Sequence, residues 1–480
     1  MTPPFRLYID GRWIEPSTTR SALVIDPASE GSIGELGFAG LEDVDQAVRA
    51  ARRAFDSYSH TALDERLRLL RRVLSEYERR STELAVAITA DMGAPVWLAE
   101  QAQAAAGLAH LKIGIQTLER YRFSELVGPT RLDRVPVGVC ALMTSWNWPI
   151  DQIACKVVPA LAVGCTVVLK PSERAPASAQ VWAQILDASG VPAGVFNLVA
   201  GDEVTAAALS AHPDVDMVSI TGSTRAGIEV ARAAAPTVKR VCQRLSGKSA
   251  NIILDDAELG EAIPAAVHAV CLNSGQSAHA PTRLLVPVRA MDDVMTLARA
   301  AAERVEVGTP ASNAVMGPVA SAEQWRRIQA FIRDGIAEGA TLVAGGLGKP
   351  NDLPRGYYVK PTLFANVTHE MKIAREAVLG PVLAIMGYHD EEQAIHIAND
   401  TAYGLAGYVQ SSDPSRAARV AARLRVGHVA INGTSPDCFA PCGGFKHSGN
   451  GREWGEYGFA DYLELRAITG SALARAHCGG

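Results

Sequence analysis

Residues 138–143 read Gly-Val-Cys-Ala-Leu-Met, a short apolar run that opens a regular alternation of strand and helix patterns. Amphipathic helical stretches separate it from further apolar runs of the same kind. Those later runs are residues 166–169, 195–199, 215–220 and 250–254. Apolar strands separated by such helices are typical of a parallel sheet that is covered on both faces. The sequence therefore predicts an α/β fold.

A second series of strand and helix patterns follows within residues 261–429. Its strand-like runs are residues 283–286, 341–344 and 382–388. A chain of 480 residues is long enough for two or three domains, each with its own core. We therefore expect two α/β domains.

Two segments outside these series have patterns of their own. Residues 7–14 contain Asp10-Gly11 between two short apolar runs, which predicts a β-hairpin. Residues 119–134 are polar. Such a segment is either an arm that pairs with another subunit or a solvated linker, and the sequence leaves both alternatives open.

Composition and charge exclude several classes of protein. The chain has 48% hydrophobic and 20% charged residues, which disfavours a disordered protein. The formal net charge is -5 and no basic block stands out, so we expect neither a nucleic-acid partner nor a membrane surface. The apolar run 157–169 is too short to span a bilayer.

The cysteines and the start of the chain indicate the cellular compartment. Residues 1–6 contain no apolar signal region. The eight cysteines are scattered and form no Cys-x-x-Cys motif, which is typical of reduced thiols. We therefore expect a cytoplasmic protein without a metal site.

Four motifs lie in a fixed order along the chain. They are Ser-Trp-Asn-Trp-Pro at 145–149, Lys-Pro-Ser-Glu at 170–173, Ile-Thr-Gly-Ser-Thr at 220–224, and the glycine-rich run 441–453. Together these motifs resemble those of the aldehyde dehydrogenase superfamily. Their order and spacing cover nearly the whole chain, which makes the resemblance specific.

The resemblance implies an aldehyde dehydrogenase-like architecture. A Rossmann-like cofactor-binding domain would comprise residues 1–118 and 138–244, and a catalytic-type α/β domain residues 245–440. A small β bridging arm with the C-terminal loop would comprise residues 119–137 and 441–480. The resemblance also implies a homodimer or homotetramer that acts on a small-molecule substrate.

The family's binding groups have counterparts here. By resemblance, Asn147 would hold the substrate oxyanion, since an amide N–H donates without changing charge; alternatively it is a turn residue before Pro149. By resemblance, Lys170 and Glu173 would bind the adenosine ribose of NAD, and a carboxylate there disfavours NADP.

Ser223 would either bind a phosphate of the cofactor or cap a helix. The remaining cofactor-binding candidates are Trp146, Ser172 and Gly222, and Ala206 stands where the family has a glycine.

The redox centre departs from the family pattern. Ala278 occupies the position of the nucleophilic cysteine, and losing a nucleophile costs about 10⁶-fold in a comparable system. Arg244 occupies the position of the general-base glutamate and cannot accept a proton. Ala377 and Leu379 replace a glutamate and a phenylalanine that contact the nicotinamide end. The cofactor is therefore NAD with weakened contacts at that end, or none.

Other side chains near residue 278 are candidates to take part. His279 is either an acid or base, or a polar residue that lines the tunnel. Ser277 and Trp148 would line the substrate pocket together with Cys438 and Phe439 of the C-terminal loop. Cys438 or Cys442 is either a displaced nucleophile or an incidental small residue.

Three functions remain open on this evidence. The first is an aldehyde dehydrogenase homologue repurposed for non-redox chemistry, such as cyclisation or isomerisation of a carbonyl- or imine-derived intermediate in a biosynthetic pathway. The alternative is an NAD-dependent aldehyde dehydrogenase that carries a cysteine-to-alanine exchange at Ala278. The second alternative is a non-catalytic pseudoenzyme. The four departures favour the first hypothesis, and the sequence does not identify the substrate.

Overall fold

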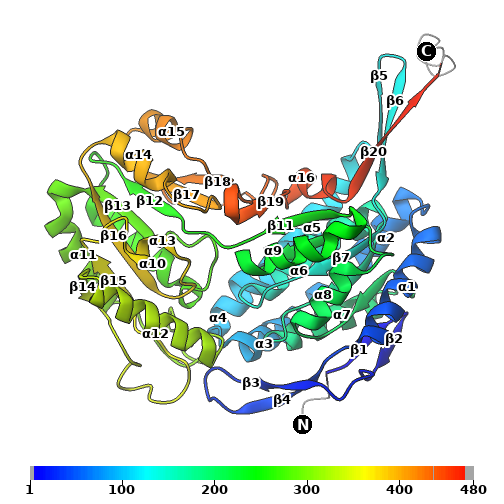
Figure 1. The fold of residues 1–480 in the computed structure, drawn as a ribbon, viewed down its shortest axis with the longest axis horizontal. Coiled ribbons are helices and arrows are strands. Elements are labelled where there is room, and N and C mark those ends of the chain that lie inside the picture. The colour runs from blue at the N-terminus through cyan, green and yellow to red at the C-terminus, as the bar shows by residue number, and fades with distance from the viewer. Residues whose placement is uncertain (1–4, 436, 471–480) are drawn as a thin grey trace.

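A computed structural model describes residues 5–435 and 437–470. It contains two large sheets that are each covered by helices, a three-stranded arm that projects from the body, and a small two-stranded sheet (Figure 1). The predicted α/β fold is confirmed. The small sheet consists of β3 (Ser21–Ile25) and β4 (Ser32–Gly37).

The first large sheet has a parallel centre. Its strand order is β19 (Gly449–Asn450), β11 (Arg240–Arg244), β10 (Met217–Thr221), β7 (Val139–Met143), β8 (Thr166–Lys170), β9 (Phe196–Leu198), β1 (Leu7–Ile9) and β2 (Arg12–Ile14). The five central strands are parallel to one another and lie in the order β11, β10, β7, β8 and β9. Their outer neighbours β19 and β1 pair antiparallel with β11 and β9. The side chains of β7 alternate between two buried clusters: Cys140 and Leu142 face one, and Val139, Ala141 and Met143 the other. Burial of both faces explains the continuous apolar run.

The helices that accompany this sheet come from the N-terminal half of the chain. They are α1 (Leu41–Tyr58), α2 (Leu63–Arg79), α3 (Ser81–Met92), α4 (Val96–Leu98), α5 (Ala105–Arg120), α6 (Pro149–Val163), α7 (Pro176–Ala188), α8 (Glu203–Ala211) and α9 (Thr224–Ala234). Helix α6 is buried along its whole length. It packs so closely on α5 that a Cβ on Gly107 would lie 2.4 Å from Ile150 and one on Gly114 2.4 Å from Val158. The position of α6 is thus tightly constrained.

The second large sheet is parallel except at one edge. Its order is β14 (Thr341–Ala344), β15 (Thr362–Ala365), β16 (Val382–Tyr388), β13 (Arg283–Pro287), β12 (Ala250–Ile253), β17 (Ala406–Gln410) and β18 (His428–Ile431). Only the β14–β15 pair is antiparallel. Its helices are α10 (Leu259–Cys271), α11 (Met291–Glu303), α12 (Ala322–Ala337), α13 (Lys372–Arg375), α14 (Glu391–Asn399) and α15 (Pro414–Ala421). The two predicted α/β series form separate sheets, except that the run 250–254, assigned to the first series, forms β12 of the second sheet.

The predicted hairpin and the polar segment both form β-structure. Strands β1 and β2 pair antiparallel, and Asp10 and Gly11 turn with φ of 52° and 74°. The polar segment forms β5 (Ser124–Val127) and β6 (Thr130–Pro136), and β20 (Leu463–Thr469) pairs with β6 (Figure 1). The segment is therefore an arm rather than a solvated linker. Whether the arm binds another subunit, and the assignment of domain roles to the ranges above, stay predictions.

The described helices do not include a membrane-spanning candidate. Within residues 5–435 and 437–470, no helix combines the length and apolar character that crossing a bilayer requires. The apolar run 157–169 lies in α6 and β8, where it is buried.

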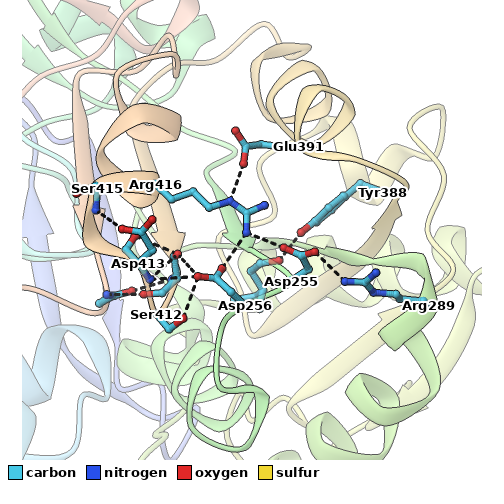
Figure 2. Close-up of polar contacts among 12 residues, drawn as sticks. Asp255, Asp256, Arg289, Tyr388, Glu391, Ser412, Asp413, Ser415 and Arg416 are labelled. Carbon is cyan, nitrogen blue, oxygen red and sulfur yellow. Dashed lines mark hydrogen bonds and ion pairs between the residues drawn. The ribbon is translucent and has the colours of Figure 1, made fainter.

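An ion-pair cluster ties α14 and α15 to the end of β12 (Figure 2). The Arg416 guanidinium contacts three carboxylates, with Nη1 at 2.7 Å from Asp255 and 3.2 Å from Asp256, and Nε at 2.8 Å from Glu391. The hydrogen bond from Arg416 is the main reason that the pKa of Asp255 is lowered. Arg289 Nη2 lies 2.8 Å from Asp255 as well, so two cations among three anions form a network rather than an isolated surface pair.

We predict that Arg416→Met lowers the free energy of unfolding by about 1 kcal/mol at pH 7, a value discounted for partial exposure of the cluster. Because the pKa of Asp255 is lowered in the folded chain, the stability that Arg416 contributes is fully present at pH values above the pKa of this carboxyl in the unfolded chain. The difference in stability between the two proteins therefore shrinks as the pH falls below about 4. Urea unfolding at pH 7 and at low pH measures it. Arg419→Met on the same helix is the matched control, because Arg419 is exposed and forms no ion pair with a described residue. Equal effects of the two substitutions would contradict the prediction.

Candidate active site

The carboxyl ends of four parallel strands open onto one large cavity. The loop after β7, the end of β8, the loop after β10 and the end of β11 all contribute to its lining, and its volume is about 1840 Å³. Ligands of open α/β sheets bind at this edge of the strands. The cavity also reaches residues of the second sheet, including Tyr408 and His428.

Most of the side chains that the sequence singled out line this cavity. Those present are Trp146, Asn147, Trp148, Lys170, Ser172, Glu173, Gly222, Ser223, Arg244, Ser277, Ala278 and His279, together with Ala206, Ala377 and Leu379. Cys438 and Phe439 were predicted for the substrate pocket, but neither is among the lining residues. Phe439 lies beneath the Arg120 guanidinium instead, and Cys442 lines the cavity. Cys478 lies outside the described residues.

Asn147 is held from three sides. Its Nδ2 donates to the Gln276 carbonyl at 2.8 Å, and its Oδ1 accepts from Gln152 Nε2 at 2.8 Å. The Asn273 side chain donates to its backbone carbonyl at 2.8 Å. These bonds fix the orientation of the amide and leave one Nδ2 hydrogen for a ligand. That Asn147 also binds a substrate oxygen stays a prediction.

The loop that carries Ala278 is packed tightly against neighbouring backbone. Asn273, Ser274 and Gly275 have φ of 56°, 55° and 73°, so three consecutive residues are left-handed. A Cβ on Gly275 would lie 2.1 Å from the Gly380 carbonyl carbon, so this position requires glycine. Trp148 Nε1 donates to Ser277 Oγ at 2.8 Å. The loop thereby places residues 276–278 beside Asn147.

A buried carboxylate lies between two cations beneath the cavity. Glu453 Oε1 is 2.5 Å from Lys156 Nζ of α6, and Glu453 Oε2 is 2.9 Å from Arg244 Nη1 at the end of β11. Burial would raise the pKa of Glu453, but Lys156 and Arg244 outweigh burial and lower it. Burial likewise opposes the charge on Arg244, whereas Cys442, Glu453 and Asp151 raise its pKa well above the ordinary value. Arg244 is therefore a cation that cannot serve as a base.

Asp151 is a second buried carboxylate on the cavity wall. His110 Nε2 lies 2.9 Å from Asp151 Oδ1, and Arg244 Nη1 lies 3.8 Å from Asp151 Oδ2. Trp454 covers this group with its ring 5.6 Å from the Arg244 guanidinium and 5.7 Å from the His110 ring. Trp454 has φ 75°, unusual for a bulky residue, and its buried Nε1 has no partner among the described residues. Strained backbone of this kind gathers at functional sites.

The other titratable groups near residue 278 are uncharged at neutral pH. Burial and then Arg244 lower the pKa of His279 to about 4. Burial raises the pKa of the Cys442 thiol to about 11, although Arg244 opposes the shift. A thiol in that state is a poor nucleophile, so the interpretation of Cys442 as an incidental small residue gains support.

The opposite end of the cavity carries donors and one carboxylate. Lys170 Nζ is buried, lies 3.7 Å from Glu173 and donates to the Pro171 carbonyl at 3.3 Å. Ser223 caps α9 by accepting from the Ala226 N–H at 3.1 Å, so its hydroxyl hydrogen remains available. Thr221 Oγ1 is buried and has no partner among the described residues. These groups suit the hydroxyls and phosphates of a dinucleotide.

Asp151, Lys156 and Trp454 were missed as site residues in the sequence analysis. A signal for two of them was present, since Asp151 and Lys156 are the two charged residues in the largely apolar helix segment Ile-Asp-Gln-Ile-Ala-Cys-Lys-Val-Val. A charge that folding must bury needs a partner, which marks a structural pair or a functional group. The positive φ of Trp454 has no signal in the sequence.

Comparison with known proteins shows the family. The model of the aldehyde dehydrogenase family matches residues 13–468. The chain therefore belongs to the aldehyde dehydrogenase family, and its fold is the aldehyde dehydrogenase-like α/β fold.

Particular relatives are also similar along their whole length. A 3-succinoylsemialdehyde-pyridine dehydrogenase from Pseudomonas sp is 54% identical over 466 residues, which cover 96% of this chain and 98% of the relative. A cysteine-to-alanine mutant of aldehyde dehydrogenase C from Pseudomonas syringae, solved in complex with NAD⁺ and octanal, is 47% identical with a TM-score of 0.96 over 97% of this chain and 96% of that one. A Mycobacterium tuberculosis aldehyde dehydrogenase solved with NAD⁺ is 36% identical with a TM-score of 0.94, over 97% and 98% of the two chains.

These relatives overturn the first functional hypothesis. The prediction of a non-redox enzyme that cyclises or isomerises a carbonyl-derived intermediate is wrong, because close relatives are dehydrogenases by name. The hypothesis rested on four positions, whereas the similarity to dehydrogenases extends over 96% of the chain. The comparisons also lend no support to a biosynthetic cyclase or to a non-catalytic pseudoenzyme, and the dehydrogenase alternative fits them better.

We predict that Glu453→Gln lowers the free energy of unfolding by about 3 kcal/mol, because it leaves the buried Lys156 without a carboxylate and Arg244 with Asp151 alone, 3.8 Å away. Urea unfolding measures the effect, and Glu456→Gln on the exposed side of α16 (Gly455–Ala460) is the matched control. Adding Lys156→Met to Glu453→Gln should recover part of the loss, since it removes the unpaired charge. A loss no larger than that of Glu456→Gln would show that the ion pairs contribute little.

Proposed function

We propose that this chain is an NAD-dependent aldehyde dehydrogenase in which alanine stands at the nucleophile position. The observation that carries the proposal is that Asn147 and the loop 276–278 are in contact in one cavity. The other end of the same cavity holds hydrogen-bond donors that suit a dinucleotide. The relative with a cysteine-to-alanine exchange was solved with both NAD⁺ and octanal. That complex supports the idea that a chain with Ala278 still binds both ligands.

Within this proposal, the chain's own residues bind and orient the aldehyde. The free Nδ2 hydrogen of Asn147 donates to the aldehyde oxygen and stabilises the negative charge that develops there. A thiol at position 278 would attack the carbonyl carbon, a step that the Ala278 methyl group cannot perform. The hydrogen bond between Trp148 and Ser277 holds the attacking position in place.

The donors at the other end of the cavity fit NAD. We propose that Lys170 and Glu173 hold the adenosine ribose and that Ser223 and Thr221 face the phosphates. The buried, unpartnered Thr221 hydroxyl supports this, because a buried polar group needs a hydrogen-bond partner. When bound, NAD supplies the oxidising nicotinamide. The weaker contact at the nicotinamide end, inferred from Ala377 and Leu379, stays a prediction, as do a homodimer or homotetramer and a cytoplasmic location.

We predict that Ala278→Cys produces NADH from an aldehyde, with roughly one NADH per active site in the first turnover, whereas the chain with Ala278 produces none in the same time. Stopped-flow absorbance at the NADH wavelength measures this burst. Ala280→Cys is the matched control, because Ala280 also lines the cavity two residues along the loop. The absence of a burst in the Ala278→Cys enzyme would overturn the proposed function.

We predict that NAD⁺ binds the chain with a micromolar dissociation constant and that NADP⁺ binds more weakly, because the Glu173 carboxylate repels a 2′-phosphate. Isothermal titration calorimetry measures both. Glu173→Gln should narrow the difference between the two cofactors. Glu261→Gln, another exposed carboxylate on the cavity wall, should leave it unchanged. Undetectable binding at millimolar NAD⁺ would count against the cofactor assignment.

A further inference from the structure

Arg244 places a positive charge in the part of the cavity that holds the loop 276–278. It lies at the end of β11, and the chain just after it contacts this loop, since a Cβ on Gly247 would lie 2.7 Å from the Ala278 carbonyl oxygen. Burial, and after it the Arg244 charge, lowers the pKa of His279 to about 4, so the guanidinium is also close to the His279 ring. Arg244 itself lines the cavity. A ligand beside this loop is therefore within reach of a guanidinium.

The protein partners of the Arg244 guanidinium lie at one of its three nitrogens. Nη1 is 2.9 Å from Glu453 Oε2 and 3.8 Å from Asp151 Oδ2. Nε and Nη2 make no hydrogen bond to any residue that the structure describes, and neither is a fully buried atom. These two nitrogens form one edge of the planar guanidinium, and such an edge holds a carboxylate through two parallel hydrogen bonds. The Nε–Nη2 edge is therefore available to a ligand.

The surroundings of the Nε–Nη2 edge favour a hydrogen-bond acceptor. The Glu453 and Asp151 carboxylates both lie beside Nη1, which points to the opposite side of the guanidinium from this edge. His279 and His428 line the same cavity, and burial is the main reason that the pKa of each ring is lowered. Both imidazoles are therefore neutral at pH 7, and each carries one N–H donor. A negatively charged ligand group at the edge meets donors rather than carboxylates.

We propose that Arg244 binds a carboxylate of the substrate, so that the aldehydes this chain takes are short oxo acids with a carboxylate at the end opposite the carbonyl. The inference rests on the proposed function, in which Asn147 holds the aldehyde oxygen of the same molecule. Asn147 stands just before α6, and Asp151 in the first turn of that helix is 3.8 Å from Arg244. The two binding groups are thus close enough for a chain of a few carbon atoms to join them.

The balance of charge around Arg244 favours a carboxylate over other groups. Lys156 and Arg244 supply two positive charges, and Glu453 and Asp151 supply two negative ones. A carboxylate adds a single negative charge to this neutral group, whereas a phosphate monoester adds up to two and is repelled more strongly. A neutral tail displaces water from the Nε–Nη2 edge without replacing its hydrogen bonds. The site therefore fits a monoanion best.

The test measures equilibrium binding to the unaltered chain, because the Ala278 methyl group cannot attack an aldehyde. The probe is 4-oxobutanoate, and its neutral match is 4-methylpentanal, which has an isopropyl group in place of the carboxylate. Ligand-observed NMR titration at pH 7 gives both dissociation constants. We expect 4-oxobutanoate to bind at least about tenfold more tightly, as two charge-assisted hydrogen bonds allow.

Substitution of Arg244 separates a role in binding from a role in structure. Arg244→Met should weaken binding of 4-oxobutanoate by about tenfold or more and leave binding of 4-methylpentanal nearly unchanged, since the neutral tail does not use the Nε–Nη2 edge. Arg244→Lys keeps the positive charge but not the two-pronged donor, so its affinity for 4-oxobutanoate should be intermediate. Arg232→Met removes an exposed arginine of the cavity wall that pairs with Glu229. It is the matched control and should change neither affinity.

A third ligand distinguishes a substrate carboxylate from that of an acid product. The ligand is 4-methylpentanoate, the acid that corresponds to the neutral aldehyde. It lacks an aldehyde for Asn147, so we expect it to bind more weakly than 4-oxobutanoate. Binding of 4-methylpentanoate as tight as that of 4-oxobutanoate would show that Arg244 holds any carboxylate, and would overturn the substrate assignment.

The remaining outcomes distinguish this inference from the proposed function. Equal or weaker binding of 4-oxobutanoate relative to 4-methylpentanal on the unaltered chain would overturn the inference alone, and this comparison needs no variant. Parallel loss of both aldehydes in Arg244→Met would do the same, because it would reveal a purely structural role. Failure of both aldehydes to bind the unaltered chain would instead count against the carbonyl site at Asn147 and hence against the proposed function.

Discussion

The Glu453 carboxylate, buried between Lys156 and Arg244, is the interaction on which the arrangement of the cavity depends. Removing a carboxylate and two cations from water costs several kcal/mol per charge, so each of them needs its partners in place. Because the three side chains come from the C-terminal loop, α6 and β11, the pairs join segments that are far apart in the sequence. The same pairs orient the helix whose first turn carries Asp151 and whose preceding loop carries Asn147.

The second constraint on the cavity is the close contact between the backbone at Gly275 and the backbone at Gly380. Gly275 has no room for a Cβ because the Gly380 carbonyl carbon is so near, and the loop around it is left-handed at three consecutive residues. Such a loop has little freedom to move relative to Asn147, which is itself held by Gln276, Gln152 and Asn273. A site held by packing and by supporting hydrogen bonds keeps its geometry when one reacting group is exchanged. The position of Asn147 relative to residues 276–278 therefore does not depend on the side chain at 278.

Much of the fold could be predicted from the sequence because its signals are local. The Asp10-Gly11 turn and the apolar strand runs depend on a few neighbouring residues, and β1, β2 and β7 form as expected. Partners in the site could not be predicted, since the pairs Lys156–Glu453 and His110–Asp151 join residues whose distance in sequence gives no local signal. The sequence gives no local signal for the position of the C-terminal loop either. Cys442 of this loop lines the cavity, Cys438 and Phe439 are not among its lining residues, and their place in a substrate pocket stays a prediction.

The wrong functional hypothesis arose from giving four positions more weight than the rest of the chain. The hypothesis took positions 278 and 244 to decide a covalent step. Substrate and cofactor affinity depend on many more contacts, and the chain is similar to named dehydrogenases over its whole length. Arg244 also has an electrostatic effect within the cavity. Burial would raise the pKa of the neighbouring Asp151, but His110 and then Arg244 lower it, while Glu453 pairs with Arg244. The positive charge of Arg244 thereby helps to keep the Asp151 carboxylate ionised at the cavity wall.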